Sequence, residues 1–364
     1  MPETNKNRLI AIAEAFDGVE GVTNVSQYGM GHINDTYLVE TKGKEKYILQ
    51  RINDKIFTDV DKLMQNIVGV TEYISAHTAA PKEECLRVIP TSGKPYLRTE
   101  EGCFRTYNFI SAGVSIEHVP TAEGLYVSAK GFGAFQAALD GYPAETLFDS
   151  IPDFHNTAVR FKKFVAAVEN DVCGRRASVQ KEIDFVTDRQ RYCDRVVGAL
   201  DRGELPYRVT HNDTKVNNVL IDVVNMRPVT VIDLDTVMRG SILYDFGDGV
   251  RSGASTGAED ERDLTKVNFS KELYAAYAKG FVGEVGGRLT EAEIGMLHFG
   301  AILMTYECGM RFLTDYLEGD TYFKTHREGQ NLDRARTQFK MVQDMEAEEK
   351  FMRETVMKYA GKRN

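Results

Sequence analysis

The chain has 364 residues, which is enough for two domains or one large two-lobed unit. Hydrophobic residues make up 42% and charged residues 27%, a balance typical of a globular chain that buries a substantial core. The formal net charge of −9 argues against non-specific binding to nucleic acid, but it leaves open an anionic substrate held by local cations.

The sequence predicts no targeting or membrane-anchoring segment. Met1 to Asn7 are polar and no apolar stretch follows them, so we expect no signal peptide. Apolar runs reach only about five residues, whereas a membrane-spanning helix needs roughly 20. The five cysteines show no CxxC spacing, which favours free thiols in a reducing compartment. We therefore expect a cytoplasmic protein without a membrane partner.

The first hundred residues are predicted to form mainly short strands. Segments rich in β-branched and aromatic residues predict strands over 22–28, 36–39, 46–52, 95–98 and 103–107. Apolar residues at helical spacing, from Val60 to Ile67, predict a helix over 59–77.

A glycine pair lies between the first two predicted strands, in Gly29-Met30-Gly31-His32-Ile33-Asn34. Alone, such a pair indicates no more than a hairpin turn. A dinucleotide-binding fold would need a helix directly after the glycines, but residues 36–39 favour a strand. Strand, glycines and strand in this order are typical of a kinase lid, whose backbone N–H groups cover phosphates. His32 is then a candidate contact to phosphate or substrate.

Helical patterns take over after about residue 112. Apolar residues at helical spacing mark segments around Phe132 to Leu139 and Phe161 to Val168. Late in the chain, long helices are predicted over 297–317 and 338–359.

A compact β-rich stretch, residues 207–250, separates the two helical blocks. Strands and helices that are segregated along the chain favour an α+β fold. The expected domains are a β-rich nucleotide lobe at 1–107, a hinge at 108–112 and a helical lobe with the catalytic and acceptor sites at 113–364.

The strongest chemical signal is the run from His211 to Asn218, which reads H-x-D-x-x-x-x-N, followed by an apolar strand that ends in Asp233-Leu234-Asp235. Phosphoryl transfer needs a base beside the acceptor hydroxyl and cations on the phosphate oxygens. Asp213 can supply the base, while Asn218 and Asp233 supply oxygens that suit Mg²⁺ together with the phosphates. Asp235 is either a second metal ligand or an exposed turn residue. Alone, Asp213 and Asn218 would also fit a turn between strands.

These motifs resemble the catalytic and magnesium loops of the protein-kinase-like fold in its aminoglycoside phosphotransferase branch, where a Tyr-Asp pair follows, here Tyr244-Asp245. More narrowly, the chain is similar to bacterial N-acetylhexosamine 1-kinases over roughly residues 25–325. The segments that carry this resemblance are Gly29 to Tyr37, Tyr47 to Arg51, His211 to Asn218, Tyr244 to Asp248 and Glu307 to Leu313.

The resemblance implies a bilobal kinase that uses ATP and Mg²⁺ to phosphorylate the C1 hydroxyl of an N-acetylhexosamine, GlcNAc or GalNAc. A nucleotide and a small sugar are thus the expected partners. The resemblance also implies that His211 supports the catalytic loop and that Asp245 holds it by hydrogen bonds. Nucleotide contacts are expected from the third strand and from Gly29, Gly31, Asn34, Asn108 and Ile110.

Two positions depart from the broader family. Its third strand carries a lysine, but this chain has Gln50 and Arg51 there, of which only one can face the cleft because strand residues alternate. Either residue could take the place of the lysine at the nucleotide. The second departure is Asn212, where the broader family usually has glycine and the hexosamine kinases resemble this chain.

Glu307, Arg311 and Asp315 lie four residues apart and share one face of a predicted helix. Glu307 before Arg311 is also a favourable surface ion pair. The functional interpretation places Glu307 and Arg311 in the acceptor pocket, with Arg311 hydrogen-bonded to sugar hydroxyls or the acetamide. Tyr316 or Tyr322 would then pack on the sugar ring.

Other functions fit parts of the sequence. Asp233-Leu234-Asp235-Thr236 after an apolar strand also matches the D-x-D-x-T motif of haloacid-dehalogenase phosphatases, whose first aspartate is a nucleophile. That motif normally opens its domain, and this alternative leaves the run from His211 to Asn218 unexplained. A non-catalytic nucleotide-binding module would explain the missing lysine. Among kinases, the alternative acceptors are aminoglycosides, choline, homoserine and other sugars.

Overall fold

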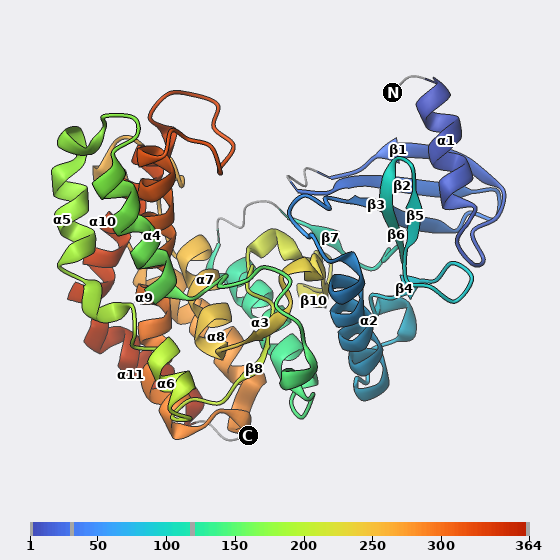
Figure 1. The fold of residues 1–364 in the computed structure, drawn as a ribbon. Helices are drawn as coiled ribbons and strands as arrows, with labels where there is room; N and C mark the ends of the chain where they lie inside the picture. The colour runs from blue at the N-terminus through green and yellow to red at the C-terminus, as the bar shows by residue number, and fades with distance from the viewer. Residues whose placement is uncertain (1–2, 30–32, 117–120, 362–364) are drawn as a thin grey trace.

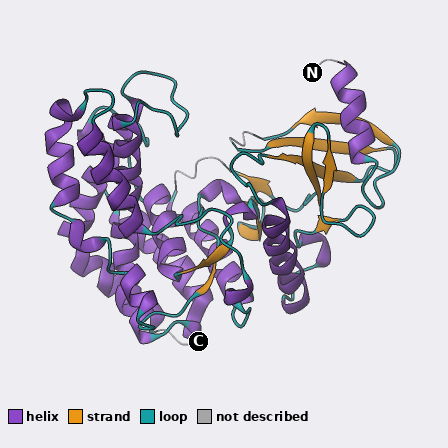
Figure 2. Ribbon diagram, viewed as in Figure 1, coloured by secondary structure: helices purple, strands orange, loops and turns teal. Residues whose placement is uncertain are grey.

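The computed structural model describes residues 3–29, 33–116 and 121–361. The chain forms two lobes, a β-rich lobe that holds the N-terminus and a larger helical lobe that holds the C-terminus (Figure 1). Strands and helices are largely segregated between the lobes, with a few short strands at the inner side of the helical lobe (Figure 2). This arrangement confirms the predicted α+β class and two-lobed architecture.

An antiparallel sheet forms the body of the N-terminal lobe. Its strands run in the order β1-β2-β3-β6-β4, and β5 also pairs with β6. The bounds are β1 Val22–Gln27, β2 Asp35–Thr41, β3 Lys46–Ile52, β4 Val88–Ile89, β5 Leu97–Thr99 and β6 Gly102–Asn108. Strands were expected at five of these places; the pattern does not predict β4, which is two residues long.

The two faces of this sheet are covered by different helices. Helix α1 (Glu3–Ala13) packs Leu9 and Ile12 against Val39 and Leu49 on the outer face. Helix α2 (Val60–His77), begun by the Asp59 side chain, buries its apolar stripe in the main core that continues into the helical lobe. The sequence predicts α2 within one residue but misses α1, because α1 is mostly polar. Residues of β3 that alternate between the faces therefore meet different surroundings.

The chain passes between the lobes directly after β6. That strand ends at Asn108, and the next strand, β7 (Val114–Ser115), already pairs with β9 of the helical lobe. The crossing therefore lies within residues 109–113, where the sheet of one lobe is nearest to the short sheets of the other.

Helices build the second lobe. They are α3 Ala122–Ala138, α4 Thr157–Asn170, α5 Gln180–Thr187, α6 Val197–Asp201, α7 Ile242–Gly253, α8 Lys271–Val285, α9 Glu291–Leu317, α10 Gln330–Ala347 and α11 Glu349–Ala360. Single 3₁₀ turns lie at 82–84, 144–146, 176–179, 190–192, 216–218, 234–236, 264–266 and 286–288. No helix in the described part of the chain is both long and apolar enough to cross a membrane.

The prediction of one helix over 338–359 is wrong. The backbone leaves helical geometry at Glu348 (φ −107°, ψ 14°), so α10 ends there and α11 begins one residue later. Helix α10 also starts earlier than expected, after Gly329, whose positive φ of 71° suits glycine. The apolar spacing conceals the break, because both helices bury residues such as Met345 and Met352 in the same core.

The 27-residue helix α9 is the axis of the helical lobe. It begins with a capping box, in which the Thr290 hydroxyl accepts the N–H of Glu293 and the Glu293 carboxylate accepts the N–H of Thr290. It crosses α7 at backbone contact, since a Cβ added to Gly247 would lie only 2.2 Å from the carbonyl oxygen of Gly300. Helix α7 is thus fixed against the middle of α9.

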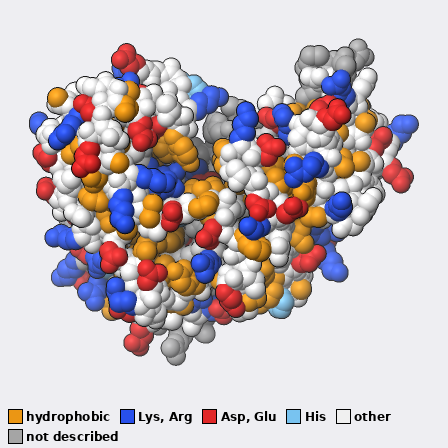
Figure 3. Space-filling model, viewed as in Figure 1, with side chains coloured by type: hydrophobic (Ala, Val, Ile, Leu, Met, Phe, Trp, Pro, Cys, Tyr) orange, Lys and Arg blue, Asp and Glu red, His pale blue; other side chains and the backbone are white. Residues whose placement is uncertain are grey.

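Two short antiparallel sheets bring the predicted catalytic segments together. Strand β8 (Arg208–Thr210) pairs with β11 (Met238–Gly240), while β9 (Val219–Asp222) pairs with β10 (Arg227–Val231). The loop 211–218 joins β8 to β9 and the loop 232–237 joins β10 to β11, so the two loops run side by side. Both face the space between the lobes, where the molecular surface is hollowed (Figure 3).

Candidate active site

The carboxylate of Asp245 holds the start of the loop 211–218 by hydrogen bonds. Asp245 lies in the first turn of α7, is fully buried, and accepts the N–H groups of His211 and Asn212 at 2.9 and 2.8 Å. Gln136 donates a further hydrogen bond to it at 2.7 Å. Burial raises the pKa of Asp245 despite these donors. On the other side, Nε2 of His211 lies 3.0 Å from the carbonyl oxygen of Ile232 and connects the two loops.

Asn212 occupies a backbone conformation that few side chains tolerate. Its φ is 64°, in the left-handed region where glycine and asparagine are favoured. This geometry explains how asparagine can stand where the broader family usually has glycine. Its side chain also donates to the carbonyl of Thr236 at 2.8 Å, a bond that glycine could not make.

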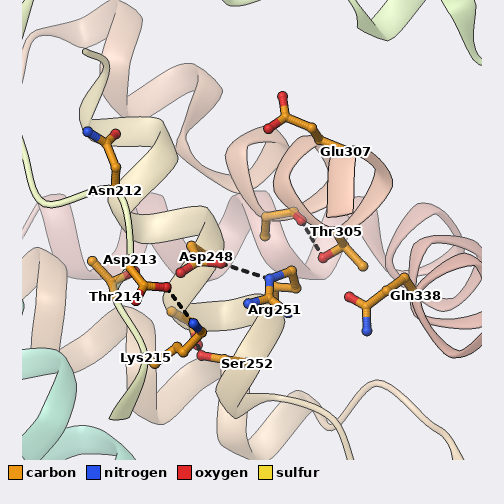
Figure 4. A network of polar contacts seen from close by, with 12 residues as sticks. Asn212, Asp213, Thr214, Lys215, Asp248, Arg251, Ser252, Thr305, Glu307 and Gln338 are labelled. Atoms are coloured by element: carbon orange, nitrogen blue, oxygen red, sulfur yellow. Dashed lines mark hydrogen bonds and ion pairs between the residues drawn. The ribbon is translucent and has the colours of Figure 1, made fainter. Parts of the chain in front are cut away.

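Two neighbours hold the carboxylate of Asp213. The ammonium of Lys215 lies 2.7 Å from Oδ1, and the amide of Asn218 donates to Oδ2 at 3.1 Å. Partial burial opposes the charge of Lys215, but Asp213 and Asp248 outweigh it and raise the pKa of the ammonium. Figure 4 shows the ion pair of Asp213 and Lys215 close to Asp248, which is in turn paired with Arg251. Asp213 keeps about a quarter of its side chain exposed, at 27%, toward the cleft.

Asp233 and Asn218 form a site that fits a divalent cation. Asn218 turns its amide nitrogen toward the carbonyl and carboxylate of Asp213, and its amide oxygen has no hydrogen-bond partner in the described part of the chain. The carboxylate of Asp233 has no hydrogen-bond or ion-pair partner among the described residues and is open to solvent on one side. Protein surrounds its other sides, and this burial, together with Asp235 and Asp213, raises the pKa of Asp233 to about 6. Oxygens with uncompensated negative charge are the donors that Mg²⁺ prefers.

The structure gives Asp235 protein partners in place of the predicted metal. Its side chain is buried, one oxygen pairs with the guanidinium of Arg105 and the other accepts the amide of Asn34 at 2.5 Å. Because both oxygens are engaged, we no longer assign Asp235 as a metal ligand. The ion pair between Arg105 and Asp235 joins the two lobes, since Arg105 lies on β6 and Asp235 follows β10. Burial opposes the charge of Arg105, but Asp235 outweighs it and raises the pKa of the guanidinium.

Strand alternation now separates Gln50 from Arg51. Gln50 faces the cleft side, where its amide oxygen accepts two hydrogen bonds from Arg105 at 2.8 and 3.0 Å. Arg51 points to the opposite face of the sheet and pairs with Asp35 at 3.7 Å. The structure therefore does not bring Arg51 near Asp213 or Asp233. On the cleft face of this sheet, Gln50, Arg105 and Asp235 form a chain of polar contacts.

Most of the other residues expected to contact the nucleotide are buried or hydrogen-bonded to other protein groups. Asn34 is buried and shared between Asp235 and the backbone N–H of Asn53. The side chain of Asn108 is occupied by the backbone of Cys85 and Arg87, and Ile110 is buried. Gly29 has a φ of 73°, as a glycine turn requires. Gly31 and His32 lie outside the described residues.

Glu307 is buried behind the catalytic loop. Its carboxylate lies 2.8 Å from Nδ1 of His155 and accepts the hydroxyl of Thr157 at 2.5 Å. Nε2 of His155 lies 3.1 Å from the carbonyl oxygen of Asn212. His155 therefore bridges Glu307 and the backbone of the loop 211–218. Although burial favours the neutral acid, His155 and Arg311 outweigh it and lower the pKa of Glu307.

Arg311 lies one turn further along α9, among aromatic rings. Its guanidinium carbon is 5.4, 5.5 and 5.9 Å from the ring centres of Phe323, Phe154 and Tyr322. No acid of the described residues pairs with it. Arg160 lies nearby and donates to the carbonyl oxygen of Phe154 at 3.0 Å. Burial and the charge of Arg311 lower the pKa of Arg160.

Sequence reasoning missed four side chains at this site: Arg105, Arg160, His155 and Lys215. Lys215 stands inside the motif, two residues after Asp213, so a charge-neutralisation argument could have found it. Arg105 lies within the apolar segment Cys103 to Tyr107, and an arginine in such a segment indicates that an acidic partner is buried with it. His155 and Arg160 lie in unremarkable sequence, and only the packing of α4 on α9 brings them to the catalytic loop.

Solved structures share this fold. An aminoglycoside phosphotransferase from Alicyclobacillus acidocaldarius is similar with a TM-score of 0.60 at 14% identity, over 96% of each chain. Choline kinase from Cryptosporidium parvum has a TM-score of 0.56 at 15% identity, over 95% of this chain and 97% of that one. An amicoumacin kinase in complex with AMP-PNP and Ca²⁺ has a TM-score of 0.57 at 13% identity, over 94% of each chain. The molecule thus has the protein-kinase-like fold of small-molecule kinases.

The sequence model of the phosphotransferase enzyme family matches residues 24–279, well over half of the chain. The chain therefore belongs to this family. The fold also removes the haloacid-dehalogenase alternative, because β10, which precedes Asp233, pairs antiparallel with β9 in the middle of a kinase-like lobe and opens no domain of its own.

Proposed function

We propose that the protein transfers the γ-phosphoryl group of ATP to the anomeric C1 hydroxyl of an N-acetylhexosamine, giving N-acetyl-α-hexosamine 1-phosphate and ADP. The observation that carries the choice of acceptor is the pair of arginines beside the catalytic loop, Arg160 and Arg311. The resemblance of the quoted motifs to N-acetylhexosamine 1-kinases supports the same choice.

Asp213 acts as the base in this proposal. The acceptor oxygen forms a bond to the γ-phosphorus, the bond from phosphorus to the leaving ADP oxygen breaks, and the hydroxyl proton passes to Asp213. Lys215 and Asn218 orient the carboxylate, and Lys215 also favours its ionised form. An anomeric hydroxyl is more acidic than an ordinary alcohol, so a carboxylate of ordinary basicity suffices.

Asn218 and Asp233 would hold Mg²⁺ in this proposal, with the free amide oxygen of Asn218 and the unpaired carboxylate of Asp233 as ligands. When bound, Mg²⁺ neutralises charge on the phosphate oxygens. The backbone of Asp233 is left-handed (φ 61°, ψ 60°), a conformation that aspartate tolerates better than most residues. His211 and Asp245 keep the two loops in register through the bonds described above.

The charges beside the loop favour a neutral acceptor over a cationic one. Choline, amino alcohols and aminoglycosides carry positive charge, and a site with two guanidinium groups repels them. Glu307 does not offset this repulsion at the surface, because its carboxylate is buried and satisfied by His155 and Thr157. A pyranose instead offers hydroxyl and acetamide oxygens to Arg311 and an apolar ring face to Tyr322.

The test is a phosphorylation assay with Mg-ATP and a panel of acceptors. We expect turnover of GlcNAc or GalNAc, with the new phosphate located at C1 by NMR. The variant Arg311→Ala should raise KM for the sugar by roughly tenfold or more, since a hydrogen bond to a charged group is worth about 1.5–3 kcal/mol. KM for ATP should stay nearly unchanged. Phosphate at C6, or brisk turnover of choline or an aminoglycoside without turnover of N-acetylhexosamines, would refute the sugar assignment.

A further inference from the structure

The connection from α9 to α10, residues 318–329, supplies the aromatic side of the proposed acceptor site. Its Phe323 packs on Phe312 of α9 with ring centres 4.6 Å apart, and Tyr322 meets Phe323 edge-on at 4.8 Å. Both loop rings lie against the guanidinium of Arg311. Tyr322 is 64% exposed and so offers a free ring face to a ligand.

A single buried carboxylate holds the backbone from which these rings branch. Asp315, in the last turn of α9, is 3% exposed. Its Oδ1 accepts the N–H groups of Thr321 and Tyr322 at 2.9 and 2.7 Å. Its Oδ2 accepts the N–H of Phe323 at 2.9 Å and the side-chain amide of Asn331 at 2.8 Å. Four donors on one ionised group make strong, directional bonds that define where the rings stand.

A second acid anchors the same turn to the rest of the lobe. Asp320 has a φ of 61° and accepts Asn331 at 2.9 Å and Arg175 at 2.7 Å. Arg175 also donates to the carbonyl oxygen of Tyr316 at 2.6 Å and lies over its ring. The turn is thus tied to α9, to α10 and to the segment before α5, so its position does not depend on a bound ligand.

We propose that Asp315 is a positioning residue for the acceptor: by holding Thr321 to Phe323 it fixes Tyr322 against Arg311 and sets the shape of the acceptor site. The inference rests on the proposed function, because it takes Arg311 and its rings as that site. Asp315 contacts no reacting atom in the proposed reaction, and among the described residues no hydrogen bond or ion pair joins the turn it holds to the N-terminal lobe. Loss of the carboxylate should therefore weaken acceptor binding and leave ATP binding unaffected.

The test compares three variants in steady-state kinetics with GlcNAc and Mg-ATP. In Asp315→Asn the new NH₂ group faces two donors in either orientation of the amide. We therefore expect the acceptor KM to rise about tenfold or more, which is about 1.4 kcal/mol per factor of ten. Asn331→Ala removes one donor and leaves the backbone bonds, so it should raise the acceptor KM by less. The control is Glu346→Gln on α10. It removes a carboxylate that Arg189 and Tyr192 bind, and it should change neither KM.

Trypsin provides an independent readout, because Lys324 is exposed in the same loop. Cleavage after Lys324 should be faster in Asp315→Asn than in the wild type, and GlcNAc should slow it in the wild type. If Asp315→Asn does not fold, the acceptor KM and the cleavage rate of Asn331→Ala test the inference in its place. An unchanged acceptor KM in these variants, or an equal rise of both KM values, overturns the inference while a raised acceptor KM in Arg311→Ala leaves the proposed function standing. If Arg311→Ala also leaves the acceptor KM unchanged, the acceptor site itself is misplaced.

Discussion

Replacing Asp235 with asparagine distinguishes a buried ion pair between the lobes from a metal ligand. In the structure this carboxylate is buried and engaged by Arg105 and Asn34. The substitution keeps the size of the side chain but removes the charge opposite a guanidinium that is 1% exposed. An uncompensated buried charge remains, and breaking such pairs typically costs about 3–5 kcal/mol. Gln50 still accepts two bonds from Arg105, so we expect a cost near the lower end, about 3 kcal/mol.

The measurement is urea-induced unfolding of the wild type and the variant, with the free energy taken from the linear extrapolation. The matched control is Asp35→Asn, which breaks the exposed pair with Arg51 on the other face of the same sheet. That change should cost less than about 1 kcal/mol. The double variant Arg105→Met, Asp235→Asn should recover part of the loss, because no unpaired charge is left. A decrease in the free energy of unfolding below about 1 kcal/mol for Asp235→Asn alone would refute the interpretation of Arg105 and Asp235 as a stabilising buried ion pair.

Activity completes this test. Under conditions in which both variants are folded, Asp235→Asn should retain measurable turnover with an ordinary Mg²⁺ dependence, whereas Asp233→Asn should lose turnover. Equal loss in both variants, or rescue of Asp235→Asn by raised Mg²⁺, would return Asp235 to the metal site.

Three further predictions concern the catalytic loops. Asp213→Asn should lower kcat by roughly 10² or more while nucleotide binding, measured calorimetrically, survives; near-normal turnover would exclude Asp213 as the base. Asn218→Ala should raise the Mg²⁺ concentration needed for half-maximal rate, and an unchanged requirement would contradict its role as ligand. Because the pKa of Asp233 is raised from its ordinary value of about 4 to about 6, its ionisation costs stability, a loss that grows as the pH rises from about 4 to 6 and is complete above 6. In a chelator, Asp233→Asn should therefore be more stable than the wild type at pH 8, with a gain that shrinks as the pH falls through about 6; a pH-independent difference would contradict this.

Local sequence predicts most of the catalytic chemistry, because His211, Asp213 and Asn218 stand within eight residues and their loop is positioned by its own flanking strands. Asp233 could be predicted for the same reason, since an apolar strand leads directly into it. Asp235 shows the limit of this reasoning. Its spacing suits a metal, but its actual partner comes from a strand 130 residues away.

The acceptor side is less predictable for a physical reason. The spacing of Glu307 and Arg311 establishes a shared helix face but not its depth, and Glu307 proves to be fully buried beneath His155. Which residues of another helix reach that face depends on how α4 packs on α9, and no local pattern encodes that packing. The same holds for the break at Glu348, because the buried faces of α10 and α11 continue one apolar pattern.

The crossing of α7 and α9 has a mechanical consequence. With no side chain between Gly247 and Gly300, the two helices cannot slide or separate without opening a gap between their backbones. Helix α7 carries Asp245, which grips the catalytic loop, and α9 carries Arg311 and Asp315. The loop 211–218 and the helix face that carries Arg311 therefore belong to one rigid frame.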